Sequence, residues 1–135
     1  MVNGQSGTCM FKTLLVEDNL TFRQTLKENI LSRFPSMQVN EAGDGEEALQ
    51  KIAADAPDLI FMDIKLPGEN GLVLTQRIKK EHPEIVVIIL TSYDLPEYRE
   101  AAYRYNANHF MTKDMSIGEI LKLVESIEAT SGRTL

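Results

Sequence analysis

At the centre of the chain an apolar run ends on a carboxylate, in the stretch Leu59-Ile60-Phe61-Met62-Asp63-Ile64-Lys65-Leu66-Pro67-Gly68. Pro57-Asp58 before the run and Pro67-Gly68 after it are turn signals, which indicate a short strand between two turns. A strand that is apolar at every position is buried on both faces, as in a parallel sheet covered by helices. Asp63 would then stand at the carboxyl end of its strand, where open α/β sheets place their ligands. A single aspartate there is only the first polar residue after a strand, so the ends of the other strands decide its meaning.

The composition is that of one soluble domain. The 135 residues are 43% hydrophobic and 25% charged, which allows one well-filled core. The net charge of −6 argues against nonspecific binding to nucleic acid or to an anionic membrane. No apolar run approaches the roughly 20 residues of a membrane span, and residues 1–10 lack the core of a signal peptide. We expect a cytoplasmic protein with a flexible leader at 1–10, whose single cysteine, Cys9, can form no internal disulfide.

Apolar runs and amphipathic segments alternate five times along the chain. Strands are expected at 13–16, 37–40 (edge-like), 59–62, 85–90 and 107–112. Helices are expected at 22–34, at 46–54, between the loop 67–71 and Pro83, at 96–106, and after a capping box of Ser116 and Glu119. The side chains expected on the buried faces of the second and fifth helices are Ala48, Leu49, Ile52 and Ala53, and Ile117, Ile120, Leu121, Val124 and Ile127. This alternation predicts an α/β fold, a parallel sheet with helices on both faces.

Four of the five predicted strands end on reactive side chains, namely Glu17 with Asp18, Asp63, Thr91 and Lys113. In a parallel sheet these ends lie along one edge. Two carboxylates about 4 Å apart repel by roughly 4 kcal/mol at an effective dielectric of 20, so three acids beside one lysine need a cation. Ligands that are all oxygen favour a hard ion, and a shallow, partly hydrated site suits Mg²⁺ better than Ca²⁺.

The other groups at this edge fit a phosphoryl ligand. Mg²⁺, the Lys113 ammonium and the Thr91 hydroxyl can each take one oxygen of a group attached to Asp63. Aspartate is a known covalent acceptor of phosphoryl groups, and the transfer needs mainly positioning and neutralisation of charge. Zinc is not supported, because neither His82 nor His109 has a cysteine or histidine at ligand spacing.

Four motifs stand at these strand ends: Leu15-Val16-Glu17-Asp18-Asn19, Met62-Asp63-Ile64-Lys65-Leu66-Pro67-Gly68, Leu90-Thr91-Ser92 and Phe110-Met111-Thr112-Lys113. With them the chain resembles the receiver (CheY-like) domain of bacterial two-component response regulators, over about residues 11–129. The resemblance implies a (βα)5 flavodoxin-like fold with strand order 2-1-3-4-5, followed by a tail at 130–135.

The resemblance also implies roles for individual residues around a magnesium ion. Asp63 matches the phosphoacceptor. Asp18 and Asp63 match the direct Mg²⁺ ligands, Glu17 matches an acid that acts through water, and the backbone carbonyl of Lys65 completes the set. Gly68 and Gly71 match loop glycines that keep the approach open, although plain turn glycines would look the same.

Further matches concern the switch and its lifetime. Lys113 matches the residue that contacts the phosphoryl group, Thr91 the switch hydroxyl and Phe110 the switch aromatic. Phe110 has no hydroxyl, so we expect it to be buried in both states. Lys65 and Tyr93, two residues past Asp63 and Thr91, match positions that flank the path of the hydrolytic water, and the bulk of Tyr93 is expected to lengthen the phosphoryl lifetime. Asp114 stands where the family usually has a proline in a cis peptide, a form that costs a non-proline residue about 2.5–4 kcal/mol.

The resemblance implies a phosphorylation switch and not an enzyme. The expected donor is a sensor histidine kinase, a phosphotransfer protein or a small phosphodonor. The surface of the fourth helix, fifth strand and fifth helix would change, and a partner or a second copy would bind there. Tyr98, Tyr103 and Tyr105 are expected on the fourth helix. One or two of them are expected to be half-buried packing residues, although aromatics there would also suit an interface. The chain is expected to be either a stand-alone regulator or a receiver from a longer protein. The region of the fourth helix resembles receivers that precede helix-turn-helix domains, which favours transcriptional regulation through a DNA-binding domain absent here, with no nucleic-acid binding by the receiver itself.

Three other classes of function fit the sequence less well. A Mg²⁺-dependent phosphohydrolase usually carries an acid two residues after its nucleophile, where this chain has Lys65, and it needs a cap for which the predicted elements leave no segment. A flavodoxin-like cofactor protein would have Ser, Thr and Gly after the first strand, where Glu17 and Asp18 would repel a phosphate. A degenerate receiver that only binds partners would not be expected to keep all three acids and Lys113.

Overall fold

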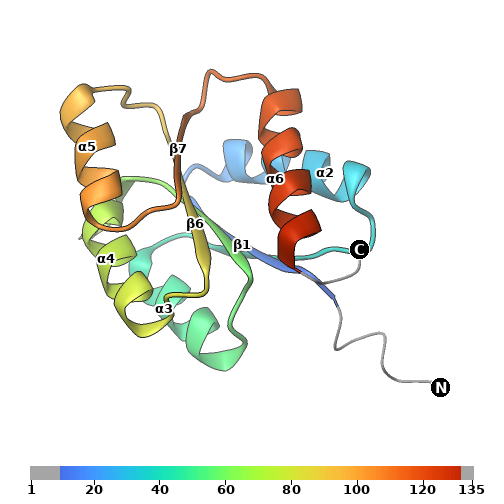
Figure 1. The fold of residues 1–135 in the computed structure, drawn as a ribbon, viewed down its shortest axis with the longest axis horizontal. Coiled ribbons are helices and arrows are strands. Elements are labelled where there is room, and N and C mark those ends of the chain that lie inside the picture. The colour runs from blue at the N-terminus through green and yellow to red at the C-terminus, as the bar shows by residue number, and fades with distance from the viewer. Residues whose placement is uncertain (1–9, 132–135) are drawn as a thin grey trace.

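The five apolar runs form one parallel sheet at the centre of the molecule. The computed structural model describes residues 10–131 (Figure 1). Its strands are β1 (Lys12–Val16), β2 (Gln38–Ala42), β3 (Leu59–Met62), β6 (Val86–Thr91) and β7 (His109–Thr112). They lie in the order β2-β1-β3-β6-β7, and every neighbouring pair is parallel. Counted along the chain this is the order 2-1-3-4-5, so the predicted fold class and strand order are confirmed.

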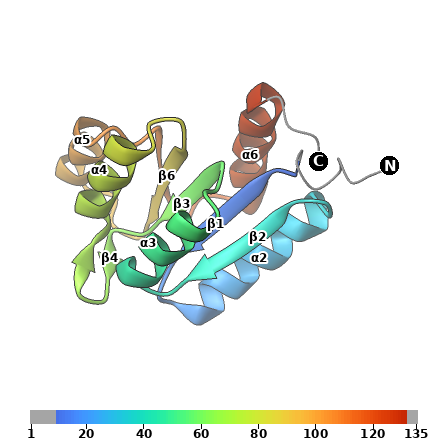
Figure 2. The ribbon, with the colours of Figure 1, turned by 90° about the horizontal axis from the view of Figure 1, so that it is seen from below.

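Helices cover both faces of the sheet, as Figures 1 and 2 show. They are α2 (Leu20–Arg33), α3 (Gly45–Ala54), α4 (Gly71–Glu81), α5 (Pro96–Arg104) and α6 (Ile117–Ser131). α2 and α6 pack on one face, and α3, α4 and α5 pack on the other. Because successive side chains of a strand point to opposite faces, Ile60 and Met62 enter one core while Leu59 and Phe61 enter the other.

β3 is the most deeply enclosed strand of the sheet. Its four side chains are at most 2% exposed, as a strand covered on both faces requires. Full burial of each such side chain contributes about 1.5–3 kcal/mol. The strand ends at Met62, and the next residue is Asp63. The Asp63 backbone N–H still donates to the Val16 carbonyl at 3.1 Å. The core therefore fixes the position of the first carboxylate at the sheet edge.

The segment after Asp63 is more ordered than a loop. Two short strands, β4 (Lys65–Leu66) and β5 (Glu69–Asn70), pair antiparallel around the turn at Pro67 and Gly68. Gly68 has a φ of +71°, which glycine adopts without strain. The sequence predicts only a loop here, because two-residue strands carry no alternating pattern.

Two side chains expected on buried helix faces are exposed. Ala53 is exposed in the last turn of α3, about 100° around the helix from the buried Ile52. Ile117 is 38% exposed, because as the first residue of α6 it lines a surface groove instead of the core. Ala48, Ile120 and the other buried positions of these two helices are fully or partly buried as expected.

The ends of the described chain add two observations. α6 continues through Thr130 and Ser131, two residues into the segment expected to be a tail. Of the expected leader, residues 1–9 with Cys9 lie outside the described residues, as do residues 132–135. Within 10–131, no helix has the length and apolar character needed to cross a membrane.

Candidate functional site

Neighbouring strands bring the predicted acids to one edge of the sheet. Val16, the last residue of β1, pairs with Met62, the last residue of β3, so the residues that follow them emerge side by side. The backbone holds these positions, since the Glu17 N–H donates to the Ala42 carbonyl at 3.0 Å and the Asp63 N–H to Val16. The register of the sheet, and not the loop, therefore places Glu17 beside Asp63.

Three carboxylates gather at this edge. Glu17, Asp18 and Asp63 each offer one oxygen, and these three oxygens lie within 4.8 Å of one another. Glu17 and Asp63 are buried, whereas Asp18 is exposed. At this separation each pair of charged carboxylates repels by about 3–4 kcal/mol at an effective dielectric of 20. All-oxygen donors with one side open to water fit a hard, partly hydrated divalent cation such as Mg²⁺.

Lys113 supplies the positive charge of the cluster. Its Nζ lies 2.6 Å from Oε1 of Glu17 and 3.1 Å from Oδ2 of Asp63, and its side chain is only 16% exposed. Its backbone N–H donates to the Thr91 carbonyl at 2.9 Å, which ties the end of β7 to the end of β6. No described residue has a cis peptide bond, so the bond between Lys113 and Asp114 is trans.

The cluster shifts the protonation of its members. Burial raises the pKa of the Glu17 carboxyl, and the charge of Asp63 adds to this, while hydrogen bonds from Lys113 and from the Asn19 N–H oppose it. Burial alone would lower the pKa of Lys113, but the two carboxylates that accept its hydrogen bonds outweigh burial and raise that pKa. Lys113 therefore stays charged at neutral pH, and a single ammonium is shared by two acids.

The predicted switch residues lie on the next two strands. Thr91 is fully buried, and its hydroxyl accepts a hydrogen bond from the Tyr93 N–H at 3.3 Å. Among residues 10–131 no hydrogen bond joins this hydroxyl to Asp63. Phe110 is 6% exposed, and the guanidinium of Arg99 covers its ring at 4.6 Å from the centroid. Phe110 is thus buried in this structure, as expected for an aromatic without a hydroxyl.

Lys65 and Tyr93 meet at the rim of the site. The Lys65 Nζ lies 5.2 Å from the centroid of the Tyr93 ring and 5.8 Å from that of Tyr98. The two tyrosines contact each other edge to face, with centroids 6.1 Å apart. Asp114 is also near this end of the sheet, where its carboxylate accepts a hydrogen bond from the Thr112 hydroxyl. The rim therefore carries one cation held over two aromatic rings.

Sequence reasoning gave no role in the site to Asn19 or Phe22, and it assigned Gly71 to an open loop without foreseeing its close packing. Asn19 caps α2 by accepting a hydrogen bond from the Phe22 N–H, and its own N–H donates to Oε2 of Glu17, both at 2.9 Å. The ring of Phe22 lies 4.7 Å from the Lys113 Nζ. Gly71 packs so tightly on Asp63 that an added Cβ would lie 1.8 Å from the Asp63 carbonyl oxygen. Only Asn19 carries a local signal, as an asparagine just before a helix.

The fold and this cluster define a flavodoxin-like α/β domain with an acidic site and one lysine at the carboxyl edge of its sheet. The family model for the response regulator receiver domain matches residues 13–125. The chain therefore belongs to the receiver domain family of response regulators, as its motifs predicted.

Known relatives agree with this assignment. The chain is 38% identical over 104 residues to a protein-glutamate methylesterase/protein-glutamine glutaminase of Geobacillus kaustophilus, covering 76% of this chain and 30% of that protein. It is 34% identical over 118 residues to the oxygen regulatory protein NreC of Staphylococcus haemolyticus, covering 86% and 54%. The crystal structure of the receiver domain of NtrX from Brucella abortus has a TM-score of 0.79 at 32% identity, covering 88% of this chain and 99% of that one. The chain thus spans only part of these curated relatives.

Proposed function

We propose that this receiver domain is a phosphorylation switch in which Asp63 accepts a phosphoryl group in the presence of Mg²⁺. Acceptance of a phosphoryl group is typical of the family to which the chain belongs. The observation that carries the proposal is the Lys113 ammonium, held between Glu17 and Asp63 beside a third acid. This arrangement supplies the positioning and neutralisation of charge that phosphoryl transfer needs.

The three acids are proposed to hold the ion. Asp18 and Asp63 would bind it directly, Glu17 through water, and the backbone carbonyl of Lys65 would complete the set. Bound Mg²⁺ would neutralise charge on the incoming phosphoryl group. A carboxylate oxygen of the buried Asp63 would attack the phosphorus of the donor. The bond from phosphorus to the donor would break at the same time, and the donor would leave as the imidazole of a phosphohistidine or as acetate from acetyl phosphate. Lys113 would move one hydrogen bond from Asp63 to a phosphoryl oxygen. The three carboxylates and the Lys113 ammonium already lie together, which supports a transfer that needs little rearrangement of these side chains.

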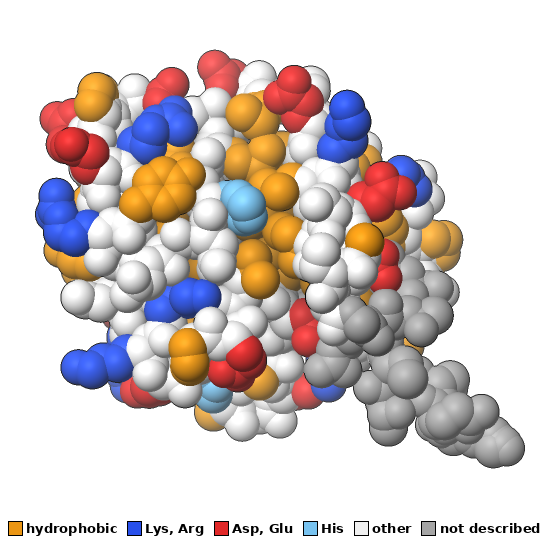
Figure 3. Space-filling view, in the orientation of Figure 1, with side chains coloured by type: hydrophobic (Ala, Val, Ile, Leu, Met, Phe, Trp, Pro, Cys, Tyr) orange, Lys and Arg blue, Asp and Glu red, His pale blue; other side chains and the backbone are white. Residues whose placement is uncertain are grey.

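Phosphorylation is proposed to act through Thr91 and Phe110. The Thr91 hydroxyl would exchange its hydrogen bond from the Tyr93 N–H for one to the phosphoryl group. The Phe110 ring, which lies beneath Arg99, would follow into the space that Thr91 leaves, and this would change the surface of α5, β7 and α6. Figure 3 shows hydrophobic side chains gathered between α5 and α6 on this face. Tyr103 of α5 is half exposed. Such a surface suits a partner protein or a second copy of the chain.

Lys65 and Tyr93 are proposed to set how long the phosphoryl group lasts. The Lys65 ammonium lies over the Tyr93 ring, and this pair stands at the ends of the segments that carry Asp63 and Thr91. A water molecule that approaches the acyl phosphate from this side would have to pass them. Their bulk is therefore expected to slow hydrolysis.

Membership of the receiver domain family is the basis for proposing a phosphoryl donor and a signalling output. A sensor histidine kinase or a phosphotransfer protein would supply the phosphoryl group, and the domain itself is proposed to act as a switch and not as an enzyme. Two curated relatives that the chain matches in part are a DNA-binding transcriptional regulator, NtrC of Escherichia coli, and the methylesterase above. We favour a transcriptional output through a separate DNA-binding domain, with no contact between this domain and nucleic acid.

Mass spectrometry after incubation with acetyl phosphate and Mg²⁺ tests the proposal. The wild type is expected to gain one phosphoryl group, and Asp63→Asn is expected to gain none. Asp94→Asn, which removes an exposed acid outside the cluster, should behave as the wild type does. Equal labelling of the wild type and Asp63→Asn would exclude Asp63 as the acceptor. Steady release of phosphate from many donors, with no labelled protein at any time, would instead favour a phosphohydrolase.

A further inference from the structure

Phe22 touches the site but has no part in the function described above. It lies in the first turn of α2, and its ring centroid is 4.7 Å from the Lys113 Nζ. At this distance an ammonium is attracted to the face of an aromatic ring, more strongly where water is excluded. Lys113 is 16% exposed, so most of the contact is shielded from solvent. The ring is thus a third neighbour of the ammonium, after Glu17 and Asp63.

The three neighbours of Lys113 differ in how they respond to a ligand. An ammonium has three N–H donors, and in this structure two carboxylates accept from it at 2.6 and 3.1 Å. Both of those acids belong to the proposed metal site, so bound Mg²⁺ and a phosphoryl group would compete for their oxygens. The Phe22 ring has no such competitor. Its contact would persist while Lys113 exchanges its hydrogen bonds.

The backbone around Phe22 makes its position precise. Asn19 accepts a hydrogen bond from the Phe22 N–H and donates one to Glu17, so a single N-cap residue links the ring to the acid. One turn later Leu26 is buried in the core. The ring also lines a groove of about 220 Å³, together with Lys113 and mostly apolar neighbours. The ring and the lysine therefore lie side by side in the wall of this open groove.

We propose that Phe22 is a positioning residue for phosphoryl transfer, whose ring holds the Lys113 ammonium in line with Asp63. The proposal rests on the proposed function. Loss of the ring face would let Lys113 turn towards the groove, and transfer to Asp63 would slow. An aromatic replacement would keep the contact, while an aliphatic residue of similar bulk would fill the space without it.

Rates of phosphorylation by acetyl phosphate in Mg²⁺ test this proposal in four proteins: Phe22→Leu and Phe22→Tyr, each in the wild-type and the Lys113→Ala background. Phe22→Leu is expected to slow the reaction about three- to tenfold, the range that a cation–π contact supports. Phe22→Tyr should stay within about twofold of the wild type. In the Lys113→Ala background, Phe22→Leu and Phe22→Tyr should react at the same rate, because the group that they position is gone. Leu20→Ala, which changes an exposed apolar residue of the same turn, should have no effect.

Two outcomes would overturn the proposal. Phe22→Leu could react as fast as Phe22→Tyr, or it could lose the same factor with and without Lys113, which would mean a purely structural role. If Phe22→Leu does not fold, Phe22→Met replaces it, with the same expectations. Absence of labelling in the wild type itself would instead count against the proposed function, so the two failures are distinguishable.

Discussion

Gly71 is the residue that the site constrains most tightly. An added Cβ would lie 1.8 Å from the carbonyl oxygen of Asp63 and 2.8 Å from its carbonyl carbon, and both are backbone atoms of the segment that carries the acceptor. The Gly71 N–H also donates to the Ile64 carbonyl at 2.8 Å. Gly68 is constrained in a different way. Its φ of +71° is a backbone conformation that favours glycine, but no atom lies within 4 Å of an added Cβ. One glycine thus serves close packing, and the other serves a turn.

Gly71→Ala is expected to destabilise the protein by about 3 kcal/mol, at the upper end of overpacking costs, because backbone cannot move aside as a side chain can. Gly118→Ala is the matched control. It lies in α6 with no atom within 4 Å of an added Cβ, so it should be neutral or stabilise by up to about 1 kcal/mol. Urea denaturation followed by circular dichroism gives both values. Equal stability of the two variants would contradict this account of Gly71.

Tyr93 is expected to govern the lifetime of the proposed acyl phosphate. Tyr93→Ala removes the ring under the Lys65 ammonium and opens the rim to water, so dephosphorylation should become several-fold faster. Tyr103→Ala serves as control, because Tyr103 is 50% exposed where Tyr93 is 43% exposed, and it lies on α5 away from the Lys65 pair. Loss of label after removal of the phosphodonor measures the rate. A Tyr93→Ala protein that loses its label no faster than the parent would refute this role.

The reactive residues at strand ends could be predicted from sequence, but their supports could not. Glu17, Asp63 and Lys113 follow apolar runs directly, so a parallel sheet must bring them to one edge. Phe22 looked like one more apolar residue on a helix face, because its contact with Lys113 joins segments 91 positions apart. The tight packing of Gly71 depends on the path of the backbone near Asp63. Neither contact leaves a local pattern in the sequence.

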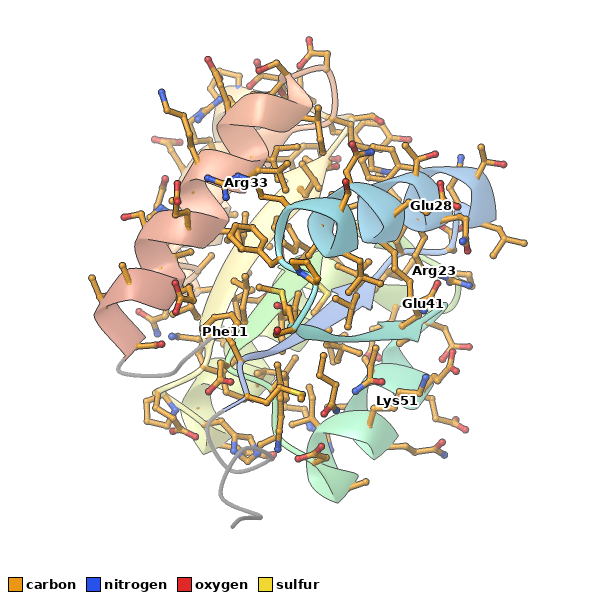
Figure 4. All side chains as sticks on the ribbon, turned by 90° about the vertical axis from the view of Figure 1, so that its right-hand side faces the viewer. Phe11, Arg23, Glu28, Arg33, Glu41 and Lys51 are labelled. Carbon is orange, nitrogen blue, oxygen red and sulfur yellow. The ribbon has the colours of Figure 1, made fainter. Side chains whose placement is uncertain are left out.

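β2 is held to α2 by a group of charges as well as by the core. Glu41 accepts hydrogen bonds from Arg23 and Lys27, each at 2.9 Å, and Arg23 also donates to the Glu17 carbonyl. Figure 4 shows Arg23 and Glu41 close together beside the sheet edge. The hydrogen bond from Lys27, together with Arg23, lowers the pKa of Glu41 from its ordinary 4.5. The end of β1 that carries Glu17 is thereby linked to an edge strand.

The lowered pKa of Glu41 predicts a stability that depends on pH. The contacts of the Glu41 carboxylate with Arg23 and Lys27 contribute fully to the stability of the folded protein above the unfolded pKa of 4.5. This contribution is lost as the pH falls through the lower pKa of Glu41 in the folded protein. Glu41→Gln should therefore destabilise the protein by about 0.5–1 kcal/mol at pH 7, and the difference from the wild type should shrink below pH 4.5. Thermal unfolding of both proteins at pH 7 and again below pH 4.5 measures this difference. Glu28→Gln, an exposed acid on α2, should show little difference at either pH, and a constant deficit for Glu41→Gln would exclude the ionic explanation.

The regular elements were predictable to the extent that burial leaves a period in the sequence. α4 buries Gly71, Leu72, Leu74, Thr75 and Ile78, so its sequence carries the apolar spacing of a helix. α5 buries only Ala102, so its main signal in the sequence is Pro96 at its first turn. Tyr105 falls just beyond its end, although the sequence suggested a helix to about residue 106. The β4–β5 hairpin was missed because backbone pairing, and not side-chain burial, forms it.

At the scale of the molecule, the topology gathers negative charge at one edge of the sheet in a chain whose net charge is already negative. The net charge is −6, yet three carboxylates share one part of the surface with one ammonium. Alternation of strands and helices was enough to predict that these groups meet, whereas the order of the strands was inferred from family resemblance. The arrangement is tolerated because strong burial of β3 and its neighbours offsets the repulsion at their ends.

Mg²⁺ is therefore expected to raise the melting temperature of the whole domain. A ligand that binds only the folded state at about ten times its Kd stabilises it by about 1.4 kcal/mol, which for a domain of this size is roughly 5 °C. Asp18→Asn should abolish the increase, since it removes an exposed ligand of the cluster without disturbing the core. Without metal, the melting temperature of Asp18→Asn should equal or exceed that of the wild type, because the repulsion among the carboxylates falls. Asp94→Asn should keep the full increase. The scans compare MgCl₂ with NaCl at equal ionic strength, so that screening alone cannot produce the shift. An equal shift in the wild type and Asp18→Asn would mean that the ion binds elsewhere, and no shift in either would mean that the acids are held together by Lys113 alone.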